Sequence, residues 1–174
     1  MPRRSPSSIS LAPGVLAALV ALNQIAGFVL LLGLVGSLVA GQLMMESVFG
    51  AEAGRSPSVL LASRILMALG IAGTVASHRV LTQLQMIVAT VRAGDPFVTE
   101  NATRLRRIAW ATLGLELLNL AAGLVTARLV PPDSPLHSSW HSSFAPWIAI
   151  LLLFVLAQVF TEGTRMRDEL DGTV

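Results

Sequence analysis

The chain has 174 residues, of which 53% are hydrophobic and only 13% are charged, and its mean hydropathy is +0.71. The charged fraction is about half of the roughly 25% found in ordinary soluble domains. A soluble protein of this size cannot remove so much apolar surface from water. These values exclude a soluble enzyme, a disordered chain and a nucleic-acid-binding protein. They predict an integral membrane protein, with the lipid bilayer as a partner and no direct nucleic-acid binding.

The charged residues are uneven in type, because all 12 basic residues are arginines. With 10 acidic residues they give a formal net charge of +2 at pH 7. The chain has no cysteine, so neither a disulfide nor a thiolate metal site can form.

Four apolar runs are long enough to cross the hydrocarbon core, which takes about 20 helical residues. They cover residues 15–40, 59–80, 108–130 and 146–162. Each must be helical, since lipid offers no hydrogen-bond partner to an exposed backbone and no alternating barrel pattern is present. The first run is far longer than the roughly 7–15 apolar residues of a cleavable signal peptide. We therefore predict a single four-span membrane domain over residues 15–174, after a disordered cytoplasmic tail over residues 1–14.

The positions of the arginines predict the orientation, because cytoplasmic loops carry an excess of basic residues. Two arginines, Arg55 and Arg128, flank the spans on one side. Nine flank them on the other side: Arg3, Arg4, Arg79, Arg92, Arg104, Arg106, Arg107, Arg165 and Arg167. This bias places both termini, and the connection between the second and third spans, in the cytoplasm.

Helical spacing continues beyond the second span, with apolar residues every three or four positions over residues 81–91. Gly94-Asp95-Pro96 then breaks the helix, and Thr99 is a suitable N-cap for the next one. We therefore expect a short cytoplasmic helical hairpin whose second helix carries Arg104, Arg106 and Arg107. Two interpretations stay open: a basic collar that only fixes the topology, or a docking surface for a soluble partner or anionic lipid.

Two charged side chains lie inside the predicted spans, where a charge is costly and indicates a functional site by default. Arg64 is near the outer end of its span, and we expect it to reach back to the outer interface. Glu116 lies deeper, on a helix face shared with Thr112, Asn119 and Gly123. We expect this face to point into the bundle, where a polar cluster forms in the inner half of the bilayer from Asn23, Gln24, Thr74, Glu116 and Asn119. The cluster serves either as interhelical hydrogen bonding, at about 0.6–2 kcal/mol per bond, or as a proton-linked switch or ion site.

Small residues recur every four positions, at Gly33, Ser37 and Gly41 on the first span and at Gly73 and Ser77 on the second. Such faces let helices approach closely. They indicate either packing within one chain or a homodimer.

Motifs of catalysis and cofactor binding are absent: no Walker loop, dinucleotide-binding glycine pattern, zinc-protease motif or paired cysteines occurs. His137 and His141, with Asp133 nearby, could share a metal only on a helix, and the Pro- and Ser-rich segment 131–146 disfavours one. We therefore predict no metal site, no cofactor and no catalytic residue, and we expect the protein not to be an enzyme.

Two groups of residues resemble a bacterial membrane family catalogued as domain-of-unknown-function family 2975. The first follows the second span and comprises Gly94, Asp95, Pro96, Phe97, Asn101, Arg104, Leu105 and Arg106. The second is a C-terminal signature comprising Ala157, Val159, Phe160, Gly163, Met166, Arg167, Asp168, Gly172, Thr173 and Val174. Members of the family often carry an acidic residue where this chain has Gln158, so we expect no role that needs a charge there.

The resemblance implies a small four-helix protein of the bacterial inner (cytoplasmic) membrane. It also implies a partner, because genes of this family often stand beside genes for small helix-turn-helix regulators. Both motif groups fall on the side that the arginines place in the cytoplasm, where the residues after the fourth span form a helical extension of mixed charge. We expect one cytoplasmic partner face formed by Gly94, Asp95, Pro96, Phe97, Asn101, Arg104, Arg106, Arg107, Gly163, Arg167 and Asp168.

The sequence thus predicts an all-α fold, an antiparallel four-helix transmembrane bundle with a short cytoplasmic helical hairpin between spans two and three. The function that we expect is that of a non-enzymatic regulatory membrane protein that holds a small cytoplasmic helix-turn-helix transcription regulator. The alternative is an accessory or subunit of a transporter or immunity system that uses the intramembrane polar cluster.

Overall fold

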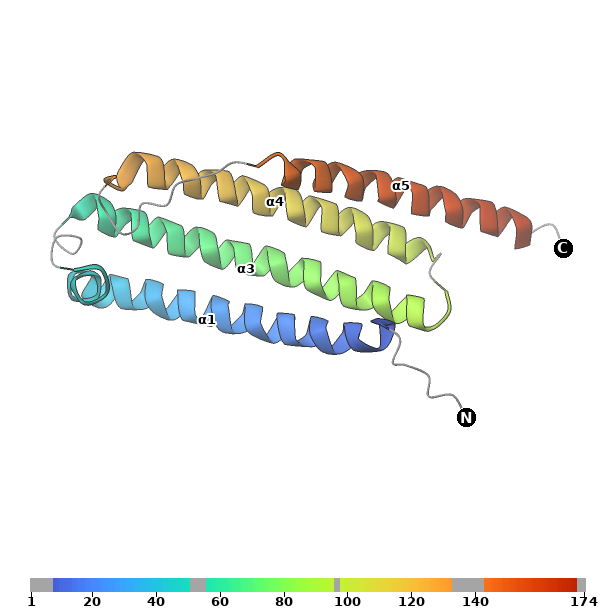
Figure 1. Ribbon diagram of the computed structural model, residues 1–174, viewed down its shortest axis with the longest axis horizontal. Helices are drawn as coiled ribbons and strands as arrows, with labels where there is room; N and C mark the ends of the chain where they lie inside the picture. Colours follow the sequence, from blue (N-terminus) through green and yellow to red (C-terminus); the bar gives the residue numbers. More distant parts are fainter. Residues whose placement is uncertain (1–7, 51–55, 96–97, 133–142, 172–174) are drawn as a thin grey trace. The chain divides into compact units, whose positions relative to one another are not determined.

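The computed structural model describes residues 8–50, 56–95, 98–132 and 143–171. Over these ranges the chain forms four helices and no strand (Figure 1). They are α1 (Ser8–Phe49), α3 (Pro57–Arg92), α4 (Thr99–Leu129) and α5 (Ala145–Asp171). The predicted all-α fold class is confirmed. α1 begins at Ser8 and continues N-terminal to the apolar run. Residues 8–14, which we expected in a disordered tail, are therefore helical.

Each helix contains a stretch suited by length and composition to crossing a membrane. These stretches are Ala12–Met44, Pro57–Arg92, Thr99–Leu129 and Ala145–Arg167, and they are 33, 36, 31 and 23 residues long. All of them exceed the roughly 20 residues that a bilayer core requires. The chain is therefore a multi-pass membrane protein by the character of its helices.

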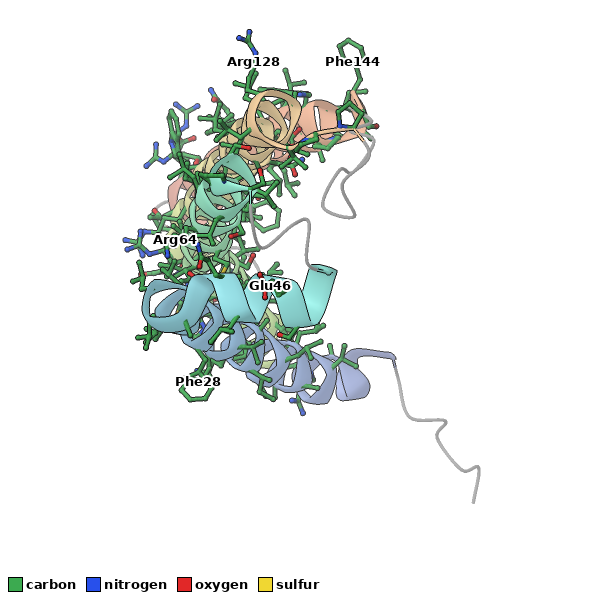
Figure 2. The ribbon with its side chains drawn as sticks, turned by 90° about the vertical axis from the view of Figure 1, so that its left-hand side faces the viewer. Phe28, Glu46, Arg64, Arg128 and Phe144 are labelled. Atoms are coloured by element: carbon green, nitrogen blue, oxygen red, sulfur yellow. The ribbon has the colours of Figure 1, made fainter. Side chains whose placement is uncertain are left out.

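The side chains on the outside of these helices are large and apolar. Leu22, Phe28 and Leu151 are each more than 60% exposed, and Figure 2 shows Phe28 pointing away from the ribbon. In water such exposure would cost about 25 cal/mol for each Å², whereas lipid tails accept apolar side chains without that cost. The exposed surface therefore suits contact with lipid.

Two compact units share the four helices. The first unit contains residues 1–23, 76–113 and 144–174, and the second contains residues 24–75 and 114–143. The first unit thus holds the connection between α3 and α4 and all of α5.

In the second unit, α1 and α3 meet along a seam in which small residues face larger ones. A methyl group added at Gly27 would lie 3.0 Å from Thr74 Oγ1, and one added at Gly33 would lie 3.5 Å from Met67 Sδ. At one pair the small residue is on α3 instead of α1: a methyl group at Gly70 would lie 3.0 Å from Leu30 Cδ1. Partner numbers on α3 fall as those on α1 rise, so the two helices run in opposite directions along this seam.

The small-residue stripe on the first span belongs to the same seam. Ser37 is fully buried, and a methyl group at Gly41 would lie 3.3 Å from Leu60 Cδ1. Together with Gly33, these residues therefore pack α1 against α3 within one chain. The antiparallel arrangement of all four helices and a homodimer stay predictions.

α1 is kinked at Ala40, where φ is −138° and ψ is 42°. The kink separates a long helix over residues 8–39 from a short one over residues 41–49. In Figure 1 the short helix is seen end-on, while the preceding part of α1 runs across the view. Met44 on the short helix packs back on the long one, since its Sδ would lie 3.4 Å from a methyl group at Gly36. The cause of the kink is a side chain of α3 and is described below.

We predict that Gly27→Ala destabilises the protein by about 1–3 kcal/mol, the usual cost of overpacking. Thr74 cannot easily move away, because it is β-branched and its hydroxyl already donates to Ile71 O at 2.8 Å. The matched control is Gly114→Ala, where nothing lies within 4 Å of the added methyl group, and we expect no loss there. Unfolding in detergent micelles, followed by far-ultraviolet circular dichroism, measures both, and equal stability of the two variants would contradict the seam.

Candidate functional site

The turn after α3 and the end of α5 lie next to each other in the first unit. Arg167 Nη1 donates to Asp95 Oδ1 at 2.5 Å, across 72 residues of sequence. Both side chains remain about half exposed, at 50% for Arg167 and 42% for Asp95. The structure therefore joins one residue from each motif group of the predicted partner face.

A specific helix-ending motif places Asp95. Gly94 N–H donates to Val91 O at 3.1 Å, and Asp95 N–H donates to Thr90 O at 3.2 Å. These are the two bonds of a Schellman motif, in which the residue after the last helical turn adopts a left-handed conformation. Gly94 fills that position with φ of +89°, which a side chain would strain. The carboxylate of Asp95 is thus held at the end of α3, within reach of α5.

A buried polar network ties the start of α4 to the end of α3. Asn101 is fully buried, and its Nδ2 donates to Thr90 Oγ1 at 2.7 Å. Thr90 Oγ1 in turn donates to Ile87 O at 2.8 Å. On its other side, Asn101 Oδ1 accepts a bond of 2.8 Å from Arg104 Nη1. The network therefore fixes both the hairpin and the direction of one arginine.

The burial of Asn101 corrects the predicted partner face. A side chain with no exposed surface cannot contact a docked protein, so Asn101 supports the surface instead of forming it. Its amide is buried because one end bonds to α3 and the other to Arg104 within α4.

The exposed part of the hairpin is basic. Arg106 and Arg107 are exposed and Arg104 is half-buried. None of the three forms an ion pair with any residue that the structure describes. Arg104 and Arg107 also line a cavity of about 280 Å³ with Gln83, Glu100 and Met86. This surface therefore presents positive charge that its own helices do not neutralise.

The end of α5 is helical to Asp171, as predicted for the charged extension. Arg165 bonds to Glu162 on its own helix at 2.6 Å and lies 3.6 Å from Glu169. Gly163 is half-buried. Pro96, Phe97 and the side chain of Asp168, which we also assigned to the partner face, lie outside the described residues. Of the tail residues predicted to bind a partner, Arg167 is thus the one that the structure connects to the hairpin.

The five residues of the predicted intramembrane cluster differ in burial, and the cluster stays a prediction. Glu116 is buried at 8% exposure, whereas Gln24 and Asn119 are exposed. None of these three makes a side-chain hydrogen bond or ion pair with another described residue. Asn23 and Thr74 are half-buried, and Thr74 donates to Ile71 O at 2.8 Å and lies against Gly27. The pattern of Thr112, Glu116 and Asn119 predicted one inward face, but helix α4 turns Asn119 out of it.

The sequence interpretation missed one residue that shapes this site, Thr90, and one consequence of another, Gly94. Thr90 was not singled out, because a threonine near a helix end is common and its partner is 11 positions away. Gly94 was recognised as a helix breaker, and the Gly94-Asp95 pair is the signal from which a helix-ending motif with an anchored carboxylate could have been predicted.

Comparison with known proteins gives one match. The model of a family described as "Protein of unknown function (DUF2975)" matches residues 44–174, which is three quarters of the chain. No curated protein and no solved structure matches it. The matched region includes the hairpin, the ion pair and the tail.

We predict that Asn101→Ala destabilises the hairpin by about 1–3 kcal/mol, because Thr90 Oγ1 and Arg104 then lose a buried partner. The matched control is Thr103→Ala, since Thr103 Oγ1 makes only a 3.5 Å contact with Thr99 O. Hydrogen exchange of the protein in micelles measures the effect, and we expect faster exchange at the end of α3 and the start of α4. Unchanged protection in Asn101→Ala would show that the network contributes nothing.

Proposed function

We propose a function from one premise, that the chain belongs to the DUF2975 family, a family of membrane proteins without an assigned activity. We propose that this chain is a non-enzymatic membrane protein. It holds a soluble cytoplasmic protein on the face formed by the turn after α3, the start of α4 and the end of α5. We call this surface the hairpin face and define its residues as Gly94, Asp95, Arg104, Arg106, Arg107 and Arg167, all of them exposed or half-buried.

The ion pair between Asp95 and Arg167 is the observation that carries this proposal. It connects segments that are remote in sequence, and the family match covers both of them. An exposed ion pair stabilises a fold by only about 0–1 kcal/mol, so stability alone is a weak reason for this contact. Recognition of a partner by a surface built from both segments is a better reason for the contact.

The chemistry of the hairpin face specifies its partner. Arg106 and Arg107 are exposed and unpaired within the described residues, so the complementary surface is acidic. A small helix-turn-helix regulator, which the family resemblance implies, would contact DNA through its basic side and meet this face through an acidic one. Such charge pairing raises association rates and selects the partner more than it adds affinity.

The alternative role in a transporter or immunity system rests on the intramembrane polar cluster. Gln24 and Asn119 are exposed and make no hydrogen bond to Glu116. No geometric observation therefore favours that alternative.

The proposal requires the hairpin face to be cytoplasmic, as nine of the 12 arginines predict. Because the chain has no cysteine, single-cysteine variants report the side of each segment without a background signal. We predict that Ala93→Cys in intact cells is protected from a membrane-impermeant maleimide, whereas Ser134→Cys is labelled. The opposite pattern would place the hairpin face outside the cell and remove the proposed function.

We also predict that changing Arg104, Arg106 and Arg107 together to Ala lowers recovery of the neighbouring regulator in a membrane pull-down by at least about tenfold, equivalent to roughly 1.4 kcal/mol. Arg128→Ala is the matched control, since Figure 2 shows Arg128 extending away from the helices. Asp95→Arg should lower recovery, and adding Arg167→Asp should restore it in part. Equal recovery with the triple variant would exclude the hairpin face as the docking surface.

A further inference from the structure

Arg64 explains the kink in α1. Its Nη2 donates at 2.5 Å to Ser37 O, the carbonyl that would accept from Gly41 in an uninterrupted helix. A side chain inserted into the main-chain hydrogen bonds is a known cause of helix kinks. The guanidinium thus caps the end of the helix over residues 8–39, where its positive charge is favourable. The expectation that Arg64 reaches back to the outer interface stays a prediction, and the contact with Ser37 O is an acceptor that the sequence did not indicate.

One hydrogen bond to a carbonyl oxygen does not satisfy all the N–H donors of the Arg64 guanidinium. Arg64 Nε is buried and has no hydrogen-bond acceptor among the described residues. No described acidic side chain pairs with Arg64 either, and this includes Glu46 on the short helix beside it (Figure 2). A half-buried charge normally has a partner, because removing it from water costs several kcal/mol. Among the described residues, the guanidinium therefore has one acceptor, Ser37 O, and no counter-ion.

A cavity lies against this guanidinium. Its volume is about 610 Å³, and its lining includes Ala40, Gly41 and Gln42 from the kink, Pro57 and Leu60 from α3, and Arg64 itself. A methyl group at Gly41 would lie 3.1 Å from Arg64 Nη2. The glycine thus leaves room for the guanidinium beside the cavity.

We propose that the cavity at Arg64 binds a phosphate group. A guanidinium presents a planar fork of donors that matches an oxyanion, and phosphate supplies the missing charge together with several acceptors. Val39 and Leu43, which also line the cavity, are 83% and 71% exposed. They offer an apolar contact beside the phosphate site, which suits the acyl chains of a phospholipid. A free phosphate ion shares the headgroup chemistry but does not use this apolar border.

The test uses the full-length protein in detergent and three probes: short-chain phosphatidylglycerol, the matching diacylglycerol that lacks a phosphate, and inorganic phosphate. Native mass spectrometry measures the fraction of protein that retains each probe. We expect the wild-type protein to retain phosphatidylglycerol at least about tenfold more than diacylglycerol. Arg64→Ala should abolish this preference, and Arg64→Lys should weaken it because Lys keeps the charge but lacks the fork. Arg128→Ala, which removes the same charge from an exposed position, should leave it unchanged.

Each outcome decides the proposal. Equal retention of the two lipids by the wild-type protein, together with no retention of inorganic phosphate, would overturn it without any variant, so a poorly folded Arg64→Ala protein does not leave the question open. A preference that persists in Arg64→Ala, or is lost equally in Arg128→Ala, would also overturn it. Retention of inorganic phosphate with the same dependence on Arg64 would support a phosphate site whose ligand is a free ion, whereas retention of the lipid alone would support a phospholipid.

Discussion

The constraint on which the second unit depends is that hydrocarbon provides no hydrophobic reason for two apolar helices to associate. Contact between α1 and α3 must then come from close packing, which requires one small residue in each facing pair. Gly27 with Thr74, Gly70 with Leu30 and Gly33 with Met67 meet this requirement. The large apolar side chains are left for the outer surface, where Phe28 is 61% exposed and suits contact with lipid. The distribution of residue sizes, more than hydrophobicity, therefore specifies which helix faces meet.

Where the helices end, water is present and polar contacts replace size matching. The two kinds of polar contact in the hairpin differ in strength. The buried network of Asn101, Thr90 and Arg104 costs about 1–3 kcal/mol to break, whereas the exposed pair of Asp95 and Arg167 contributes about 0–1 kcal/mol. The buried network is thus the rigid part of the hairpin, and the ion pair to α5 is the contact that opens more easily.

The helices could be predicted from the sequence because a bilayer imposes a simple rule on length and apolar character. Three of the four runs lie within helices, the run 108–130 extends one residue beyond α4, and the family resemblance agrees with the match over residues 44–174. The kink at Ala40 could not be predicted in the same way. It depends on Arg64, 24 positions later on another helix, and no local pattern around Ala40 records that contact.

Side-chain burial was the hardest feature to predict. Asn101 and Asn119 are both asparagines on α4, yet one is fully buried and the other exposed. The difference lies in the neighbours, because Asn101 faces Thr90 across the hairpin turn, while no described residue bonds to Asn119. Helical periodicity assigns residues to a face, but it does not say what stands opposite that face.

The same argument separates the two charged residues of the spans. Glu116 and Arg64 both violate the rule that charges avoid the bilayer, and depth alone made Glu116 the stronger candidate. The structure reverses that order. Glu116 is buried, and no hydrogen bond or ion pair joins it to another described residue. Arg64 breaks a helix to gain one acceptor and borders an open cavity, and no acidic side chain in the described part of the chain pairs with it. A guanidinium stays charged at any physiological pH, so Arg64 is the residue of the two whose charge calls for an anion.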